Sequence, residues 1–395
     1  MNAAALPLAI GDTPSDRDRE LLLAFLGLLA LGLALMGSAS FGIAEQHTGD
    51  PFHYLIRQGG YAGVGLLAAF AAAQIPSRHI ECAGPWLLFA ALALLTLVLI
   101  PGVGRTVNGA TRWIPLGAVN VQAAELVKLC VIVYLGGYLV RHGATVRARA
   151  TGSFKPMLFV ALVGLLLLAQ PDFGAVAVLL VTVLGMMFLG GARLWPFGLL
   201  LAVSAAALAL SAITEPYRLE RLTGFMDPWA DPYGSGFQLI QALIAIGRGE
   251  WFGAGLGASV QKLFYLPEAH TDFLYAVLAE ELGLAGTLAV LGLYGWLTAR
   301  IFAVARRAET LERPFNAFLC WGVGLWLAFQ AFVHIGVNLG LLPTKGLTLP
   351  LMSYGGSSMV ATCLALGLVF RVDYENRRAV IPERADPKTA AGERP

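Results

Sequence analysis

Long apolar stretches alternate with short polar segments along almost the whole chain. A membrane-spanning helix needs about 20 predominantly apolar residues, and about 17 can suffice. Ten segments are candidate spans, at residues 21–43, 55–75, 85–101, 120–140, 157–170, 174–191, 195–213, 272–299, 315–339 and 350–371. The fifth is shorter than the rule prefers, but its flanks leave no better partition. The pattern predicts an all-α, polytopic integral membrane protein with about ten transmembrane helices.

The composition agrees with a membrane protein. Hydrophobic residues make up 57% of the chain and charged residues only 13%, where a soluble chain carries about a quarter charged residues. A net charge of +2 is too small to suggest nucleic acid as a partner. The four cysteines lie in or beside apolar stretches, so a disulfide framework is not expected.

The distribution of Lys and Arg predicts the orientation. Ten crossings place both termini on one side, and most of the 27 basic residues fall in segments on that side, which is therefore cytoplasmic. Residues 1–20 form a cytoplasmic segment, and the acidic balance before the first span favours a retained helix over a cleaved signal peptide. Residues 21–371 form the membrane domain, with a large extracytoplasmic loop at 215–271. The polar residues 372–395 are expected to be a disordered cytoplasmic tail.

The large loop ends at the cluster Glu268, His270 and Asp272, where the chain turns apolar again. An ionisable residue at the edge of a span is a candidate functional residue. The structural alternative is that Asp272 caps the following helix. Within the loop, residues 237–246 between glycines predict a short amphipathic helix. Gly253, Gly255 and Gly257 follow it in a turn that would let the backbone approach a ligand, although a tight surface loop is the favoured interpretation.

Two pairs of charged residues fall inside predicted spans. Glu125 and Lys128 are three residues apart and share one helix face, so they predict an intramembrane ion pair that positions helices, or a direct contact with substrate. For Glu280 and Glu281, a structural role as carboxylates buried against partner helices is the favoured interpretation.

Several outer segments carry cations. Arg105 and Arg112 lie in the loop after the third span, and Lys345 lies just before Ser353-Tyr-Gly-Gly, which suggests an irregular start to the last span. Each cation could instead contact lipid headgroups. Together with Asp272, they suit transfer from a lipid-linked phosphate donor, with a carboxylate as base and cations on the departing phosphate.

Five motifs occur in order along the chain: NGATRWIPLG (108–117), QPDFG (170–174), DPWADPYGSGFQLIQALIAIGRG (227–249), YLPEAHTDF (265–273) and PTKGLTLPLMSYGGSS (343–358). With them the chain closely resembles the SEDS family (shape, elongation, division and sporulation) of peptidoglycan glycosyltransferases. The last motif is more similar to the cell-division branch than to the elongation branch.

The resemblance implies polymerisation of lipid II, as donor and acceptor, during septal wall synthesis in the bacterial cytoplasmic (inner) membrane. It places the catalytic aspartate at Asp272, the functional lysine at Lys345 and the charged pair at Glu125 and Lys128. Arg105, Arg112, His270 and Ser353 are further candidates for substrate binding. The implied partners are a class B penicillin-binding transpeptidase of the FtsI type and other division proteins. A divalent cation, Mg²⁺ or Mn²⁺, is compatible with this chemistry, although no metal-ligand spacing indicates one.

One departure and two alternatives remain open. The family commonly has Arg and Pro where this chain has Asn120 and Ala123, which removes a cation and loosens the start of the fourth span. Intramembrane charges and broken helices would also suit a transporter that flips a lipid-linked precursor. A purely structural scaffold for division would make Asp272 dispensable.

Overall fold

The computed structural model describes residues 14–107, 109–117, 119–149, 151–192, 224–263, 265–343 and 346–380, together with residues 198, 202 and 206. Side chains in the first helix are described from residue 19 onward. The predicted seventh span, 195–213, falls almost wholly outside the described residues.

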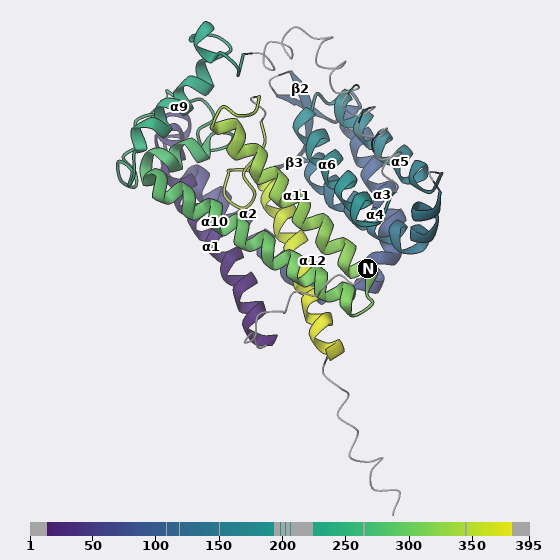
Figure 1. The fold of residues 1–395 in the computed structure, drawn as a ribbon. Helices are drawn as coiled ribbons and strands as arrows, with labels where there is room; N and C mark the ends of the chain where they lie inside the picture. Colours follow the sequence, from purple (N-terminus) through teal and green to yellow (C-terminus); the bar gives the residue numbers. More distant parts are fainter. Residues whose placement is uncertain are drawn as a thin grey trace, which may run out of the picture.

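Helices dominate the described chain (Figure 1). They are α1 (Pro14–Thr48), α2 (His53–Gln74), α3 (Ser77–Leu99), α4 (Ala123–Ala148), α5 (Thr151–Ala169), α6 (Phe173–Leu189), α9 (Phe237–Gly249), α10 (Leu274–Thr310), α11 (Pro314–Asn338) and α12 (Gly356–Val380). Seven of them, namely α1, α3, α4, α5, α10, α11 and α12, are long and apolar enough to cross a membrane, and α6 is a shorter apolar helix. α2 coincides with the second predicted span. The predicted all-α, multi-pass membrane fold is therefore confirmed.

The helices pack as one bundle in which α11 and α12 contact helices on both sides (Figure 1). α12 lies along α2, α10 along α11, and α3 along α4. α4 is apolar on all sides and buried along most of its length, as expected for a helix surrounded by other helices. Its buried residues include Glu125 and Lys128.

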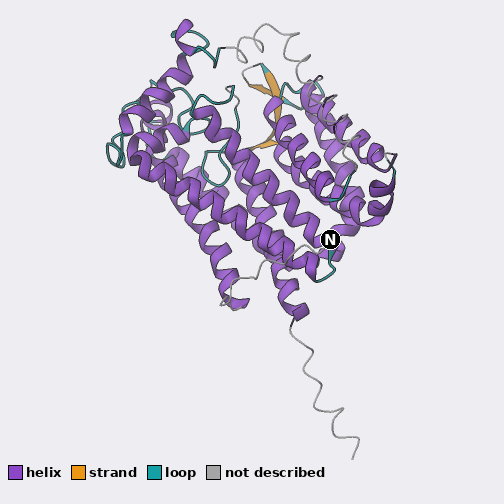
Figure 2. Cartoon of the chain, in the orientation of Figure 1, coloured by secondary structure: helices purple, strands orange, loops and turns teal. Residues whose placement is uncertain are grey.

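A small antiparallel sheet at one end of the bundle was not predicted (Figure 2). Its strands, in the order β1-β2-β3, are β1 (Arg105–Val107), β2 (Ala110–Leu116) and β3 (Val119–Gln122). Gly109 and Gly117 follow β1 and β2 with φ of 75° and 64°, a conformation that glycine adopts without steric cost. The fourth membrane helix therefore begins at Ala123 rather than at residue 120.

α10 is broken near its first third, where the glycine-rich turn of the large loop packs against it. Gly283 has φ 67° and ψ −163° inside the helix. The carbonyls of Glu280 and Glu281 accept from the amides of Ala254 and Gly255 at 2.9 and 3.0 Å. A Cβ on Gly253 would lie 2.1 Å from the Glu281 carbonyl oxygen. The backbone of this turn therefore packs closely against α10.

The predicted boundaries at both termini differ from the structure. Helix α1 already begins at Pro14, inside the expected N-terminal segment, and α12 continues to Val380, so residues 372–380 are not a disordered tail. Ion pairs one turn apart, such as Arg371–Glu375 at 2.8 Å, support the last turns of α12. Residues 381–395 lie outside the described residues.

Candidate active site

Asp272 lies at the start of α10, where three segments meet. Phe273, not Asp272, occupies the N-cap position. The Asp272 amide donates to the Glu268 carbonyl at 3.1 Å, and its own carbonyl accepts from Asn338 Nδ2 at 3.1 Å. Its side chain is partly exposed. The backbone on both sides of the carboxylate is thus held in place while the carboxylate stays accessible.

The segment after Lys345 lies directly against this carboxylate. A Cβ added to Gly346 would be 3.0 Å from Asp272 Oδ2, so the absence of a side chain at residue 346 permits the close approach. Lys345 itself, with Thr344, lies outside the described residues. The sequence predicted that Lys345 and Asp272 lie at the same outer level of the membrane. Gly346 follows Lys345 and lies beside Asp272, so the backbone next to Lys345 is close to the aspartate.

A ladder of polar side chains on α11 supports this junction. Gln330, His334 and Asn338 are spaced by four residues and therefore share one helix face. Gln330 Nε2 donates to the Thr348 carbonyl at 3.0 Å, and His334 Nδ1 lies 2.6 Å from the Leu347 carbonyl. Asn338 bridges Asp272 and the amide of Ala276, at 3.1 Å each. This face of α11 thus fixes the 346–349 segment relative to the start of α10. The sequence analysis did not identify these three residues, although their spacing in an apolar helix was a usable signal.

The Glu125–Lys128 ion pair is present and buried. Lys128 Nζ lies 2.9 Å from Glu125 Oε1 and donates to Gln330 Oε1 at 2.7 Å. It also lies 5.0 Å from the centroid of the Trp326 ring. Glu125 Oε2 is buried and has no hydrogen-bond partner among the described residues. The pair therefore joins α4 to Gln330, the first residue of the polar ladder on α11, as the helix-positioning interpretation requires.

Arg105 and Arg112 have different environments. Arg112 donates from Nε to the Gln170 carbonyl at 3.1 Å and from Nη2 to the Pro171 carbonyl, and Nη1 lies 4.0 Å from Asp172 Oδ1. Its guanidinium group therefore joins β2 to the turn between α5 and α6. Arg105 is exposed on β1. Among the described residues, Arg105 has no comparable network of contacts.

Asp172 ends the QPDFG turn as a helix cap. Its carboxylate accepts from the Ala175 amide at 3.1 Å at the start of α6, and from Gln122 Nε2 at 3.3 Å. An N-cap side chain satisfies one of the free amides at a helix start.

His270 lies in an aromatic cluster beside Asp272. Its ring centroid is 5.0 Å from that of Tyr54 and 5.5 Å from that of Tyr354, and its carbonyl accepts from the Tyr354 amide at 2.9 Å. Burial lowers the pKa of His270 below its usual value, although the Glu268 carboxylate acts in the opposite direction. His270 is therefore neutral at physiological pH.

Ser353 shapes the turn before α12. Its hydroxyl accepts from the Leu349 amide at 3.0 Å, and the side chain is buried. Gln58 of α2 donates from Nε2 to the Ser353 carbonyl at 3.0 Å and accepts from the Gly355 amide at 3.3 Å. The predicted irregular start of the last span is thus a non-helical segment that ends where α12 begins at Gly356.

Two networks hold the large loop on α10. Glu280 accepts from Ser259 Oγ at 2.5 Å and from Arg248 Nη1 at 3.2 Å. Glu281 pairs with Lys262 Nζ at 2.7 Å and accepts from Ser38 Oγ of α1 at 2.6 Å. The structural role favoured for both glutamates agrees with these contacts. The contribution of Lys262 was missed, because its partner is 19 residues away in sequence.

The divalent cation that would be compatible with this chemistry has no preformed site in the described part of the chain. No group of three or more His, Cys, Asp or Glu side chains there is arranged to hold a metal ion. The carboxylate next to Asp272 in sequence is that of Glu268, which accepts a hydrogen bond from Thr271 Oγ1 at 2.7 Å.

Comparison with known proteins identifies the family. The sequence model of the cell-cycle protein family that comprises FtsW, RodA and SpoVE matches residues 19–378. The chain belongs to this family. Among its FtsW members, the probable peptidoglycan glycosyltransferase of Thioalkalivibrio sulfidiphilus is 57% identical over 91% of this chain and 90% of its own. That of Nitrosococcus halophilus is 54% identical over 95% and 97%.

Solved structures of FtsW/RodA/SpoVE proteins share the fold. Rod-shape-determining protein RodA of Thermus thermophilus superposes with a TM-score of 0.67 at 34% identity, covering 90% of this chain and 96% of that one. A second solved chain comes from a structure described as the structural coordination of polymerization and crosslinking by a peptidoglycan synthase complex. It superposes with a TM-score of 0.73 at 37% identity, covering 90% of this chain and 97% of that one. The resemblance drawn from the five motifs is therefore confirmed.

Proposed function

We propose that this protein polymerises lipid II into glycan strands for the septal cell wall, with Asp272 as the general base. The glycosyltransferase class rests on relatives that share more than half of their residues with nearly the whole chain. The assignment of Asp272 rests on one observation: its carboxylate is partly exposed while the backbone around it is held from two sides. A base must reach its proton in a defined geometry, and this arrangement provides one.

In the proposed reaction, Asp272 takes the proton from the 4-hydroxyl of the acceptor sugar. The hydroxyl oxygen then forms a bond to the anomeric carbon of the donor, and the bond from that carbon to the pyrophosphate oxygen breaks. Undecaprenyl pyrophosphate leaves with the electron pair. A single displacement of this kind inverts the anomeric centre, as in inverting glycosidases.

Cations near the carboxylate would stabilise the departing pyrophosphate. Lys345 is the proposed cation, because the residue after it contacts Asp272. Arg105 could add a second contact from β1, whereas Arg112 is better suited to hold the α5–α6 turn that its guanidinium group already binds. We derive no step through a metal ion, because the described residues do not form a metal site.

The location of the reaction follows from the predicted orientation. With both termini cytoplasmic, Asp272 and the large loop face the outer side of the inner membrane, where a class B transpeptidase of the FtsI type would crosslink the new strands. In support of such a partner, a similar solved chain is described in terms of coordinated polymerization and crosslinking.

Purified protein in liposomes tests the proposal, with lipid II supplied only on the side that Asp272 faces. We expect glycan polymer from the wild type and none from Asp272→Asn, which keeps the shape of the side chain but removes its basicity. Binding of lipid II should persist in the variant. Glycan synthesis by Asp272→Asn would refute the assignment of the base. Movement of lipid II across the bilayer without polymer would support the transporter alternative.

A further inference from the structure

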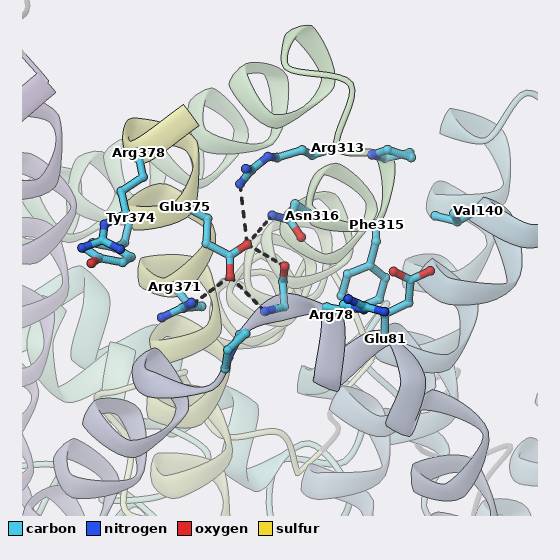
Figure 3. A pocket seen from close by; sticks show the side chains of 13 residues that line it. Arg78, Glu81, Val140, Arg313, Phe315, Asn316, Arg371, Tyr374, Glu375 and Arg378 are labelled. Carbon is cyan, nitrogen blue, oxygen red and sulfur yellow. Dashed lines mark hydrogen bonds and ion pairs between the residues drawn. The ribbon is translucent and has the colours of Figure 1, made fainter. Parts of the chain in front are cut away.

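A polar pocket lies at the end of the bundle opposite Asp272. α11 starts at this pocket with Pro314 and ends at Asn338 beside Asp272, and its 25 residues span about 37 Å. The pocket has a volume of about 490 Å³. It is formed by the first turns of α3 and α11 and the last turns of α12 (Figure 3). Nothing in the proposed reaction uses it.

Glu375 holds the three helices together at the base of this pocket. Its carboxylate accepts from Ser77 Oγ at 2.6 Å, from Arg371 Nε at 2.8 Å and from Asn316 Nδ2 at 3.0 Å. Arg313 Nη1 adds an ion pair at 3.7 Å. The Ser77 amide donates as well, at 3.0 Å, so five donors from α3, α11, α12 and the residue before α11 surround one carboxylate (Figure 3). Two of them, Arg313 and Arg371, carry positive charge.

The remaining lining is positively charged. Four arginines (Arg78, Arg313, Arg371 and Arg378) face only two glutamates (Glu81 and Glu375), an excess of two positive charges. In the part of the chain that the structure describes, neither Arg78 nor Arg378 forms an ion pair. Arg378 instead lies 4.9 Å from the centroid of the Tyr374 ring, which orients its guanidinium group. The pocket therefore offers forked donors that have no anionic partner.

Its surroundings indicate a ligand that comes from the bilayer. α3 begins at the pocket with Arg78, and a few turns further on the same helix exposes Trp86 and Phe89, with 76% and 58% of their surfaces accessible. Large exposed apolar side chains on a membrane helix face lipid. Val140 and Phe315 add apolar wall to the polar base. A phosphate with an attached apolar chain fits this combination better than a free ion does.

We propose that this pocket binds the phosphate headgroup of an anionic phospholipid. The group that the arginine forks would bind is a phosphate monoanion or a phosphodiester. Basic pockets between helix ends on the cytoplasmic side are known to bind such headgroups. The lipid binds the folded protein and joins the ends of α3, α11 and α12, so it raises the stability of the fold by mass action. Because α11 and α12 both reach the active-site end, the same lipid stabilises the helices that carry Asn338 and the segment before Gly356.

The test compares thermal unfolding of the full-length protein in detergent micelles under three conditions. The micelles contain phosphatidylglycerol, or phosphatidylcholine, or no phospholipid but glycerol 3-phosphate in solution. We expect phosphatidylglycerol to raise the melting temperature of the wild type and the other two additions to have little effect. The variant Arg78→Gln/Arg378→Gln should lose at least half of that shift. The matched control, Arg149→Gln/Arg306→Gln, removes the same charge at the same end of the bundle but outside the pocket, and should keep the shift.

Native mass spectrometry provides a second measurement if the pocket variant is unstable. The single variants Arg78→Lys and Arg378→Lys keep the charge but lose the fork, and should retain fewer phosphatidylglycerol molecules than the wild type. An equal shift in the pocket and control variants would refute the site. Stabilisation by glycerol 3-phosphate equal to that by phosphatidylglycerol would refute the lipid as its ligand.

Discussion

Asn338 joins the last turn of α11 to the backbone of Asp272. Its Nδ2 donates to the Asp272 carbonyl at 3.1 Å, and its Oδ1 accepts from the Ala276 amide at 3.1 Å. One buried side chain therefore sets the position of the proposed base relative to the helix that follows it. The two residues are 66 positions apart in the sequence, so the geometry of the site depends on the position of α11.

Asn338→Ala should lower both stability and polymerisation. The substitution leaves a buried carbonyl and a buried amide without their partner, which costs about 1–3 kcal/mol. Thermal unfolding and the initial rate of lipid II polymerisation measure the two effects. The control Asn316→Ala removes a buried asparagine at the other end of α11, where its partner is Glu375. It should lower stability but leave the rate per folded molecule close to wild type. Equal rate losses in both variants would mean that Asn338 acts only through stability.

Substitutions in the buried ion pair should be strongly non-additive. Lys128→Met strands the Glu125 carboxylate, whereas Glu125→Leu leaves Lys128 with its hydrogen bond to Gln330. Removing one partner of a buried pair costs about 3–5 kcal/mol, while an apolar pair of similar volume is often neutral. We therefore expect Lys128→Met to be the more damaging single variant and Glu125→Leu/Lys128→Met to be more stable than it. Thermal unfolding of all three decides, and additive losses would show that the two side chains do not stabilise each other.

Gly253→Ala should release the large loop from α10. The glycine has φ +80°, and a Cβ would lie 2.1 Å from the Glu281 carbonyl oxygen, so the backbone must move. The matched control is Gly257→Ala, which has φ +83° but no atom within 4 Å of the added Cβ. The control should cost only the conformational strain of about 1 kcal/mol, and Gly253→Ala clearly more. Limited proteolysis of the loop should be faster in Gly253→Ala than in the control, and equal rates would contradict the contact.

The stability of the protein should fall in mild acid in a way that depends on His270. Its pKa is lowered in the folded state, mainly by burial, with Glu268 raising it and His47 lowering it further. The unfolded state therefore binds the proton more readily, and folding stability is lost as pH falls through the ordinary histidine pKa of about 6.5. His270→Gln should flatten the decline of the melting temperature between about pH 7.5 and pH 5. The exposed residue His79 supplies the control, since His79→Gln should leave the decline unchanged.

Local patterns in the sequence were enough to predict the membrane class and most of the helices. Apolar stretches predicted α1 to α6 and α10 to α12, because a helix that crosses lipid must satisfy its backbone internally and cover itself with apolar side chains. The Glu125–Lys128 pair followed from a spacing of three residues on one helix. Short strands do not have this signature: β1 and β2 fell in the predicted loop after the third span, and most of β3 was assigned to the start of the fourth span.

Only the tertiary structure decided which distant segments meet at the site. The contacts of Asn338 with Asp272, of Arg112 with the Gln170–Pro171 turn, and of Lys262 with Glu281 join different elements. Nothing in the local sequence specifies such partners, because they depend on how the helices pack. The same holds for Gly253, which was predicted to lie in a surface turn and instead packs against the break in α10 at Gly283. The sequence thus indicated which residues are candidates for the chemistry, and helix packing determined how they are held.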